Sequence, residues 1–146
     1  MKKLALGICT LIACFVFASC SHDPSDALDK MKDLKKKAEK VKTADDLVDV
    51  TVDFYEAAID FYKGNPSKSQ VEKFDERTSE FYQALYKAQG DFKKSEKNKL
   101  KKLKKDKSTH YKMIKLQREL EDAEWDYNYE KNKKDKDDDD DDDDDE

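Results

Sequence analysis

Few side chains in this sequence have the types and spacing that catalysis or metal binding requires. The histidines His22 and His110 have no carboxylate at a ligand spacing, and the Glu-x-x-His pattern of a di-iron bundle does not occur. No nucleophile elbow and no glycine-rich phosphate loop is present. Four carboxylates fall together on the polar side of one predicted helix, where we expect solvent: Asp49, Asp53, Glu56 and Asp60. The sequence therefore predicts a protein that is not an enzyme and holds no metal or cofactor.

All three cysteines lie in the first twenty residues, as Cys9, Cys14 and Cys20. The chain begins with a methionine and two lysines, followed by an apolar stretch of fourteen residues at 4–17. That stretch is shorter than the roughly twenty residues that span a bilayer. Small and then polar residues follow, an order typical of a secretory signal peptide, which we place at residues 1–19. Because no later cysteine exists, the exported chain should form no disulfide and no thiolate metal site.

The letters FASC at positions 17–20 resemble the lipobox of bacterial lipoproteins. This resemblance implies cleavage before Cys20, a diacylglyceryl group on its thiol and acylation of the new amine, with residues 20–25 as a lipidated tether. Several acyl chains hold a protein firmly on a membrane. In the lipoproteins that this leader resembles, Asp after the lipidated cysteine often retains the protein at the inner membrane, so the resemblance with Ser21 at this position implies the outer membrane of the cell envelope. Two alternatives stay open. The letters LIAC at 11–14 would place the lipid on Cys14, and an ordinary secretory signal would leave the cysteine incidental.

A lysine-rich segment, residues 93–107, has nine lysines against two carboxylates and a net charge of +7. It is either a solvated helix face or a site for a polyanion such as lipid headgroups or acidic polysaccharide. Aromatic residues flank this segment instead of alternating with the lysines, and the chain is predicted to be exported, so we do not expect nucleic acid. Lipid contact is favoured, since each lysine near an anionic surface contributes about 1 kcal/mol. The candidate residues are Lys93, Lys94, Lys97, Lys99, Lys101, Lys102, Lys104, Lys105 and Lys107.

The chain ends in nine consecutive aspartates and a glutamate, 137–146, which carry ten negative charges. Such a run repels itself and buries nothing, so we expect residues 133–146 to be a disordered poly-Asp tail. It could act as a solubilising tail, fold back onto the lysine segment, or bind calcium weakly, since calcium takes oxygen ligands. The cation-binding candidates are Asp137, Asp138, Asp139, Asp140 and Asp141.

Four tyrosines lie away from the main apolar positions of their predicted helices: Tyr82, Tyr86, Tyr127 and Tyr129. Tyrosine is common at protein interfaces because it joins a large apolar ring to a polar hydroxyl. These four residues are therefore the candidates for binding a partner.

Apolar spacing throughout the chain predicts an all-α fold. Residues 44–63 carry two adjacent apolar seams, one through Leu47, Phe54 and Phe61 and one through Val52 and Ile59, so this helix should be the centre of the core. Only two prolines and three glycines occur, too few for the turns of a β fold. We expect an antiparallel three- to four-helix bundle, or a helical hairpin, within residues 26–132. The predicted helices span 26–42, 44–63, 67–89 and 111–129, with Trp125 helping to close the bundle.

Local signals predict where these helices begin and end. The hydroxyl of Thr43 should accept a backbone N–H at the start of the second helix. Gly64 should end that helix in a left-handed conformation, Asn65 should cap the next helix and Pro66 should lie in its first turn. The lysine segment should lie on the surface or project from it, with a kink near 108–109.

These features together predict a membrane-anchored, non-catalytic lipoprotein of the cell envelope that binds another protein or an envelope polymer. One alternative is a holdase-like periplasmic chaperone, in which a charged helical body with aromatic patches shields unfolded clients. A second alternative is a passive cation-binding surface protein. Self-association through the seams of 47–62 is a further expectation, because antiparallel hairpins often pair.

Overall fold

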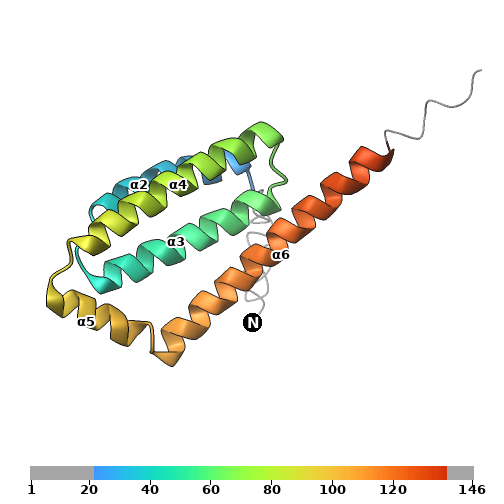
Figure 1. Ribbon diagram of the computed structural model, residues 1–146. Helices are drawn as coiled ribbons and strands as arrows, with labels where there is room; N and C mark the ends of the chain where they lie inside the picture. The colour runs from blue at the N-terminus through green and yellow to red at the C-terminus, as the bar shows by residue number, and fades with distance from the viewer. Residues whose placement is uncertain (1–21, 138–146) are drawn as a thin grey trace, which may run out of the picture.

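The structure, a computed structural model, describes residues 22–137, with side chains as far as Lys133. Every regular element in this range is an α-helix, which confirms the all-α prediction for this part of the chain. No strand occurs within it. The five helices are α2 Pro24–Glu39, α3 Ala44–Lys63, α4 Lys68–Gly90, α5 Lys94–Leu103 and α6 Lys107–Asp137 (Figure 1).

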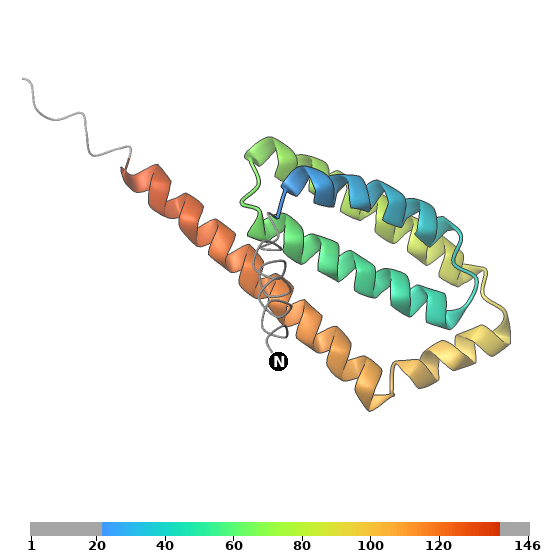
Figure 2. The ribbon, with the colours of Figure 1, turned by 180° about the vertical axis from the view of Figure 1, so that it is seen from behind.

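Helices α2, α3 and α4 lie side by side, and the connections between them fall at alternating ends (Figures 1 and 2). The backbone of α2 comes close to those of both α3 and α4. The short α5 lies against the start of α3. From there α6 runs along the other side of α3 and extends past the end of the three-helix group (Figure 1). The molecule therefore has a three-helix core and an arm, which consists of α5 and α6.

Stacked aromatic rings fill the space between α3 and α4. Phe54 stacks on Phe81 with ring centroids 4.7 Å apart, and Phe61 stacks on Phe74 at 4.3 Å. Offset stacking of this kind adds about 0.5–1.5 kcal/mol to the gain from burying the rings. Phe61 and Phe81 are fully buried. The first predicted seam of α3 therefore forms the centre of the core, as expected.

The second seam of α3 packs against α6. Val52 and Ile59 form a separate buried cluster with Leu116. The expectation of two adjacent apolar faces on α3 is thus confirmed, and each face has its own partner helix. Because helices of the same chain cover both seams, neither is available for the self-association predicted through residues 47–62.

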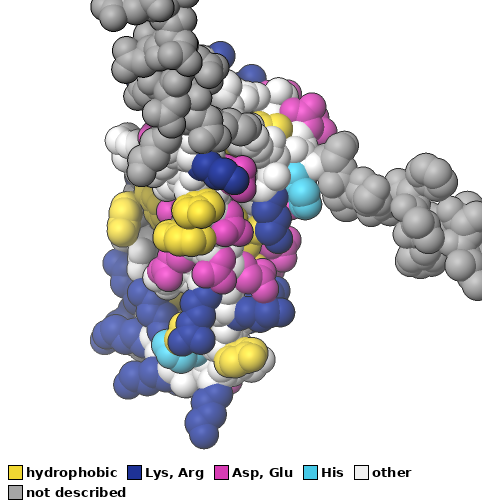
Figure 3. All heavy atoms as spheres, turned by 90° about the vertical axis from the view of Figure 1, so that its right-hand side faces the viewer, with side chains coloured by type: hydrophobic (Ala, Val, Ile, Leu, Met, Phe, Trp, Pro, Cys, Tyr) yellow, Lys and Arg dark blue, Asp and Glu magenta, His cyan; other side chains and the backbone are white. Residues whose placement is uncertain are grey.

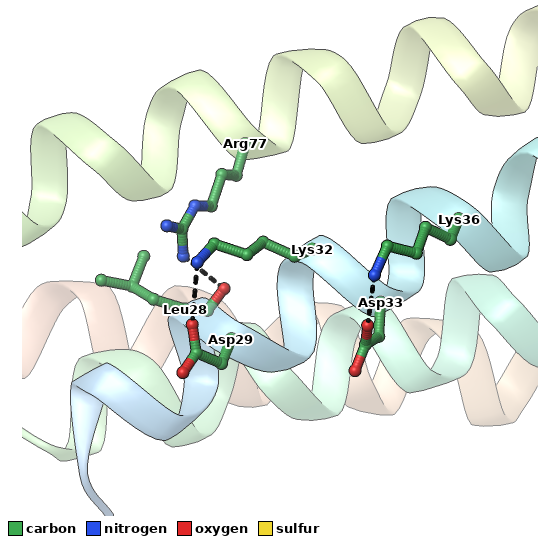
Figure 4. Close-up of polar contacts among 6 residues, drawn as sticks. All are labelled: Leu28, Asp29, Lys32, Asp33, Lys36 and Arg77. Atoms are coloured by element: carbon green, nitrogen blue, oxygen red, sulfur yellow. Dashed lines mark hydrogen bonds and ion pairs between the residues drawn. The ribbon is translucent and has the colours of Figure 1, made fainter.

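Polar contacts tie α4 to α2 and stabilise the exposed side of α2. The guanidinium of Arg77 donates a hydrogen bond to the backbone carbonyl of Leu28, in the first half of α2 (Figure 4). Two ion pairs with i,i+3 spacing follow along α2, Asp29–Lys32 and Asp33–Lys36, both at 3.2 Å. Exposed pairs of this type contribute little each, so α2 is held mainly by its buried apolar side chains.

The loop between α3 and α4 differs from the sequence prediction. Gly64 has a φ of −75°, in the right-handed region, and Asn65 takes the left-handed conformation with a φ of 53°. The cap of α4 is Ser67, whose side chain forms a reciprocal capping box with Gln70, and Pro66 precedes it. Glycine is needed at 64 for space, because a Cβ there would lie 2.3 Å from the carbonyl oxygen of His22.

Three further helix boundaries test the sequence prediction. The Thr43 hydroxyl accepts the N–H of Asp46 at 3.1 Å, as predicted. Helix α2 begins at Pro24, two residues earlier than expected, so the predicted tether is shorter than residues 20–25. The kink predicted near 108–109 is instead a break at 104–106, where the carboxylate of Asp106 caps α6 by accepting the N–H of Thr109 at 2.9 Å.

Candidate functional site

The lysine segment is held at the start of α3 by three contacts. Leu100 is buried in the main core cluster. The carboxylate of Glu96 accepts the backbone N–H of Ala44 at 2.8 Å, which satisfies one of the donors that every helix leaves open at its first turn. Lys99 pairs with Asp45 on the exposed side, and this contact raises the lysine pKa. The position of α5 is therefore fixed although most of its surface is charged.

We call the nine lysines of residues 93–107 the lysine surface. All nine side chains are exposed. Lys99 is engaged with Asp45, and Lys97 donates to the carbonyl of Gly90 at 3.0 Å. Within residues 22–133, the other seven lysines form no ion pair with a carboxylate of the protein. The lysine surface therefore offers uncompensated positive charge to a polyanion.

Next to this surface, a shallow hollow of about 490 Å³ lies between the end of α4 and α5. Lys97 and Lys101 of α5 line it at a spacing that places both on one side of the helix. Lys104, the residue that caps the end of α5, and the backbone of Gly90 also line it. Tyr86 lines it from α4 and is 72% exposed. Gln89 and Leu100 complete the lining. We call this the Tyr86 hollow.

The Tyr86 hollow combines an aromatic ring, an amide and three ammonium groups. Charged donors give the stronger hydrogen bonds to an anion, and an exposed ring offers a flat apolar surface to a ligand. Tyr86 and the lysines were predicted as two unrelated sites, and the structure brings them together. Gln89 was missed, because its role depends on α5 folding back toward the end of α4.

The four candidate tyrosines do not form one surface. Tyr82 is half-buried against Phe54 and Phe81, and burial raises its pKa to about 12. Tyr127 is buried and packs against Tyr62 at 5.7 Å. These two belong to the packing of the fold, contrary to the expectation that they lie free for a partner. Tyr86 and Tyr129 are exposed, on different helices.

Trp125 also differs from its predicted place in the bundle. It is 64% exposed and stacks on Tyr129 with ring centroids 5.3 Å apart. The sequence contains a signal for this pair. Trp125 and Tyr129 are four residues apart, so they lie on the same side of α6. Each follows a buried residue, Ala123 or Tyr127, by two positions, which places the pair on a different side of the helix from the buried residues. Trp125 and Tyr129 therefore form an exposed aromatic pair on α6.

Acidic residues between positions 119 and 130, which we call the acidic band, surround the Trp125–Tyr129 pair on α6. Figure 3 shows acidic and apolar side chains together on this face, with lysines gathered below them. A second hollow, of about 570 Å³, lies between the end of α3 and α6. Burial and the nearby Asp75 raise the pKa of Glu124, and burial is also the main cause of the raised pKa of Tyr62. The carboxylates that line this hollow are Glu119, Asp122, Asp126 and Glu130. Among the side chains of residues 22–133, no group of histidines and carboxylates is arranged to hold a metal ion.

His22 lies at the opposite end of α3 from the lysine surface. Its Nδ1 is 3.0 Å from a carboxylate oxygen of Asp60, and its backbone passes over Gly64. The other histidine, His110, is exposed near the start of α6. The twenty residues of α3 separate the two ends of the core by about 30 Å.

Several predicted sites lie outside the described residues. These are Cys20, its alternative Cys14, and the tail candidates Asp138, Asp139, Asp140 and Asp141; the side chain of Asp137 is also not described. Among the helices that the structure describes, none is both long enough and apolar enough to cross a membrane. Comparison with known proteins finds no matching family model, no matching curated protein and no matching solved structure.

Proposed function

We propose that this protein is a lipid-anchored, non-catalytic protein of the cell envelope that binds an acidic polysaccharide at the Tyr86 hollow and the adjoining lysine surface. The observation that carries this proposal is the junction of exposed Tyr86 with Lys97, Lys101 and Lys104 around one hollow. Lysines alone suit any polyanion. The added ring and the Gln89 amide suit a ligand that has both apolar faces and hydroxyl groups, as acidic sugars do.

The place of the proposed anchor also favours a polymer over lipid headgroups. Two peptide bonds separate Cys20 from His22, so a lipid on Cys20 would enter the membrane within about 8 Å of that residue, plus the length of the cysteine side chain. The lysine surface lies at the other end of the core. An anchor at Cys20 therefore does not by itself press the lysines onto the same bilayer, and it leaves them accessible to a polymer.

We infer that the helical part is an antiparallel bundle and that the acidic tail is disordered after Asp137. Because α6 continues to Asp137, the start of the tail predicted at residue 133 is five residues too early. The side-by-side packing of α2, α3 and α4 supports the first inference, and the uninterrupted negative charge of residues 137–146 supports the second. The outer membrane remains the proposed location, on the basis of the residue that follows Cys20.

The test is binding of the full chain, in non-ionic detergent, to fluorescently labelled polygalacturonate, with neutral dextran as the control polymer. We expect saturable binding that weakens with salt. Replacing Lys97, Lys101 and Lys104 by Gln should weaken it about tenfold or more, because each lost charged hydrogen bond weakens the complex. Tyr86→Ala should weaken it further, and Tyr86→Phe should not.

A matched control removes the same charge elsewhere. Lys63, Lys68 and Lys73 are exposed at the opposite end of the core, and replacing them by Gln should change affinity by less than about twofold, the effect of weak long-range attraction. Equal losses in the two triple variants would overturn the proposed site, since only net charge would then matter. Equal binding to dextran would overturn the ligand class.

A holdase-like chaperone is the second candidate function, and the exposed Trp125–Tyr129 pair favours it. Such a protein should suppress the aggregation of unrelated unfolded clients. Replacing Trp125 and Tyr129 by Ser should abolish that suppression, whereas replacing Lys97, Lys101 and Lys104 by Gln should not. The reverse pattern would reject the chaperone function.

A further inference from the structure

We propose that the acidic C-terminal segment of one copy of this protein binds the lysine surface of a second copy. The contact uses part of the proposed polysaccharide site but does not depend on polysaccharide binding. Three observations carry it: the charges of the two segments are opposite and similar in size, the tail cannot cover residues 93–107 of its own chain, and the two charges lie at opposite ends of α6.

The two segments carry charges of opposite sign and similar size. Residues 93–107 hold nine lysines against two carboxylates, a net charge of +7. Residues 131–146 hold four lysines against eleven carboxylates, a net charge of −7 before the terminal carboxylate is counted. The four lysines of residues 131–136 therefore leave most of the negative charge of this segment uncompensated. A surface of matching size and opposite sign is present on α5.

A tail cannot cover the lysine surface of its own chain. Helix α6 runs 31 residues from Lys107 to Asp137, which places its two ends about 45 Å apart. The nine residues of 138–146 extend to at most about 32 Å. Even at full extension the last residue would stop about 13 Å short of Lys107, and α5 leads away from that point (Figure 1). Folding back onto the lysine segment, which the sequence alone left open, is therefore excluded while α6 stays helical.

The charges along α6 also direct the tail away from its own lysines. Lys112 and Lys115 continue the lysine surface onto the first turns of α6. Between residues 119 and 130 the helix holds six carboxylates and no lysine or arginine. A tail folding back along α6 would have to pass this acidic band, which repels it. The lysine surface of a second copy presents no such barrier, because that copy can approach with its basic end first.

This arrangement makes the contact a regulator of the proposed site. A tail bound on α5 of a second copy occupies the lysines that a polyanionic ligand would use, so tail and polysaccharide should compete. Both interactions are screened by salt, since the charges are exposed.

The experiment is a complementation test by analytical ultracentrifugation of the full chain, with non-ionic detergent in large excess over protein. One variant has every aspartate of 138–145 changed to Asn, and the other has Lys101, Lys104 and Lys105 changed to Gln. At low salt we expect the unchanged protein to self-associate and each variant alone to remain monomeric. A mixture of the two should form a one-to-one complex, because one variant keeps its lysine surface and the other keeps its tail.

The same complex should dissociate in about 0.5 M NaCl, where the screening length falls to about 4 Å. A variant with Lys63, Lys68 and Lys73 changed to Gln should associate like the unchanged protein. If the mixture stays monomeric, or if association survives loss of the tail charge, the proposal is wrong. Polysaccharide binding separates this result from the proposed function, because the tail variant should bind polygalacturonate at least as tightly as the unchanged chain.

Discussion

The three-helix core and the α5–α6 arm are held in place by different kinds of contact. Between α3 and α4, phenylalanine rings stack in pairs and Phe61 and Phe81 are fully buried. The arm is held to α3 by scattered apolar residues such as Leu100 and Leu116, and it exposes a long series of charges and several aromatic rings. The core therefore supplies the stability, and the arm supplies the surface on which the proposed binding depends.

The difference predicts unequal responses to mutation. Core residues should affect the unfolding of the whole chain, whereas arm residues should affect local opening or binding. Regions with few buried apolar contacts open at lower free energy than the core of the same protein.

The largest effect should come from Phe61→Ala. The substitution leaves a cavity beside Phe74, its stacking partner. Truncation of a buried phenylalanine costs about 3–5 kcal/mol, so the chain should unfold at a much lower urea concentration. Phe61→Leu is the control, since it keeps most of the volume. A loss below about 1 kcal/mol in the alanine variant would show that the stacked rings are not the centre of the core.

A smaller and more local effect is expected for Leu116→Ala on α6. Leu116 contacts Val52 and Ile59 in the separate buried cluster between α3 and α6. The free energy of unfolding should fall by about 2 kcal/mol, the low end for leucine truncation. Amide hydrogen exchange should accelerate in α6 and stay slow in α2 and α4. Equal acceleration in all the helices would mean that the core and the arm unfold as one cooperative unit.

The core was predictable from the sequence because its apolar residues recur at helical spacing. Both seams of α3 follow from that spacing alone. The cap at Thr43 follows from a hydroxyl side chain directly before the first residue of the helix. Tyr127 was misjudged because its neighbour in space, Tyr62, lies on another helix. Gly64 was misjudged because the reason for the glycine is the passage of His22, which is distant in sequence.

The candidate site was only half predictable. Composition is enough to find the lysines and to find Tyr86. Their junction depends on a break at 104–106 and on Leu100 anchoring α5 to the core, and neither gives a glycine or proline signal. The limited reach of the tail likewise follows only once α6 is known to be continuous from Lys107 to Asp137.

Gly64→Ala tests the crossing of the two chain segments at the end of the core. The new Cβ would lie 2.3 Å from the carbonyl oxygen of His22 and 2.7 Å from the ring of Pro24. Backbone has to shift, at a cost of about 1–3 kcal/mol. Gly90→Ala is the matched control, because nothing lies within 4 Å of a Cβ there, and it should be neutral or stabilise by about 0.5 kcal/mol. Thermal denaturation should separate the two variants; identical midpoints would show that His22 does not lie against Gly64.

The smallest effect concerns acid pH and the cap of α6. Hydrogen bonds from the backbone and side chain of Thr109 lower the pKa of Asp106 below its ordinary value. The stabilisation is therefore fully present above the unfolded pKa of about 3.9, and it is lost as pH falls through the lower folded value. Chemical shifts of the Thr109 amide should follow this titration and report fraying confined to the first turn of α6. Asp106→Asn keeps an acceptor without a titrating group, so its first turn should lose this acid dependence. If the asparagine variant frayed with the same acid dependence, other carboxylates would be responsible for the fraying. The Asp106 cap would then not be what holds the first turn of α6 at the break between α5 and α6.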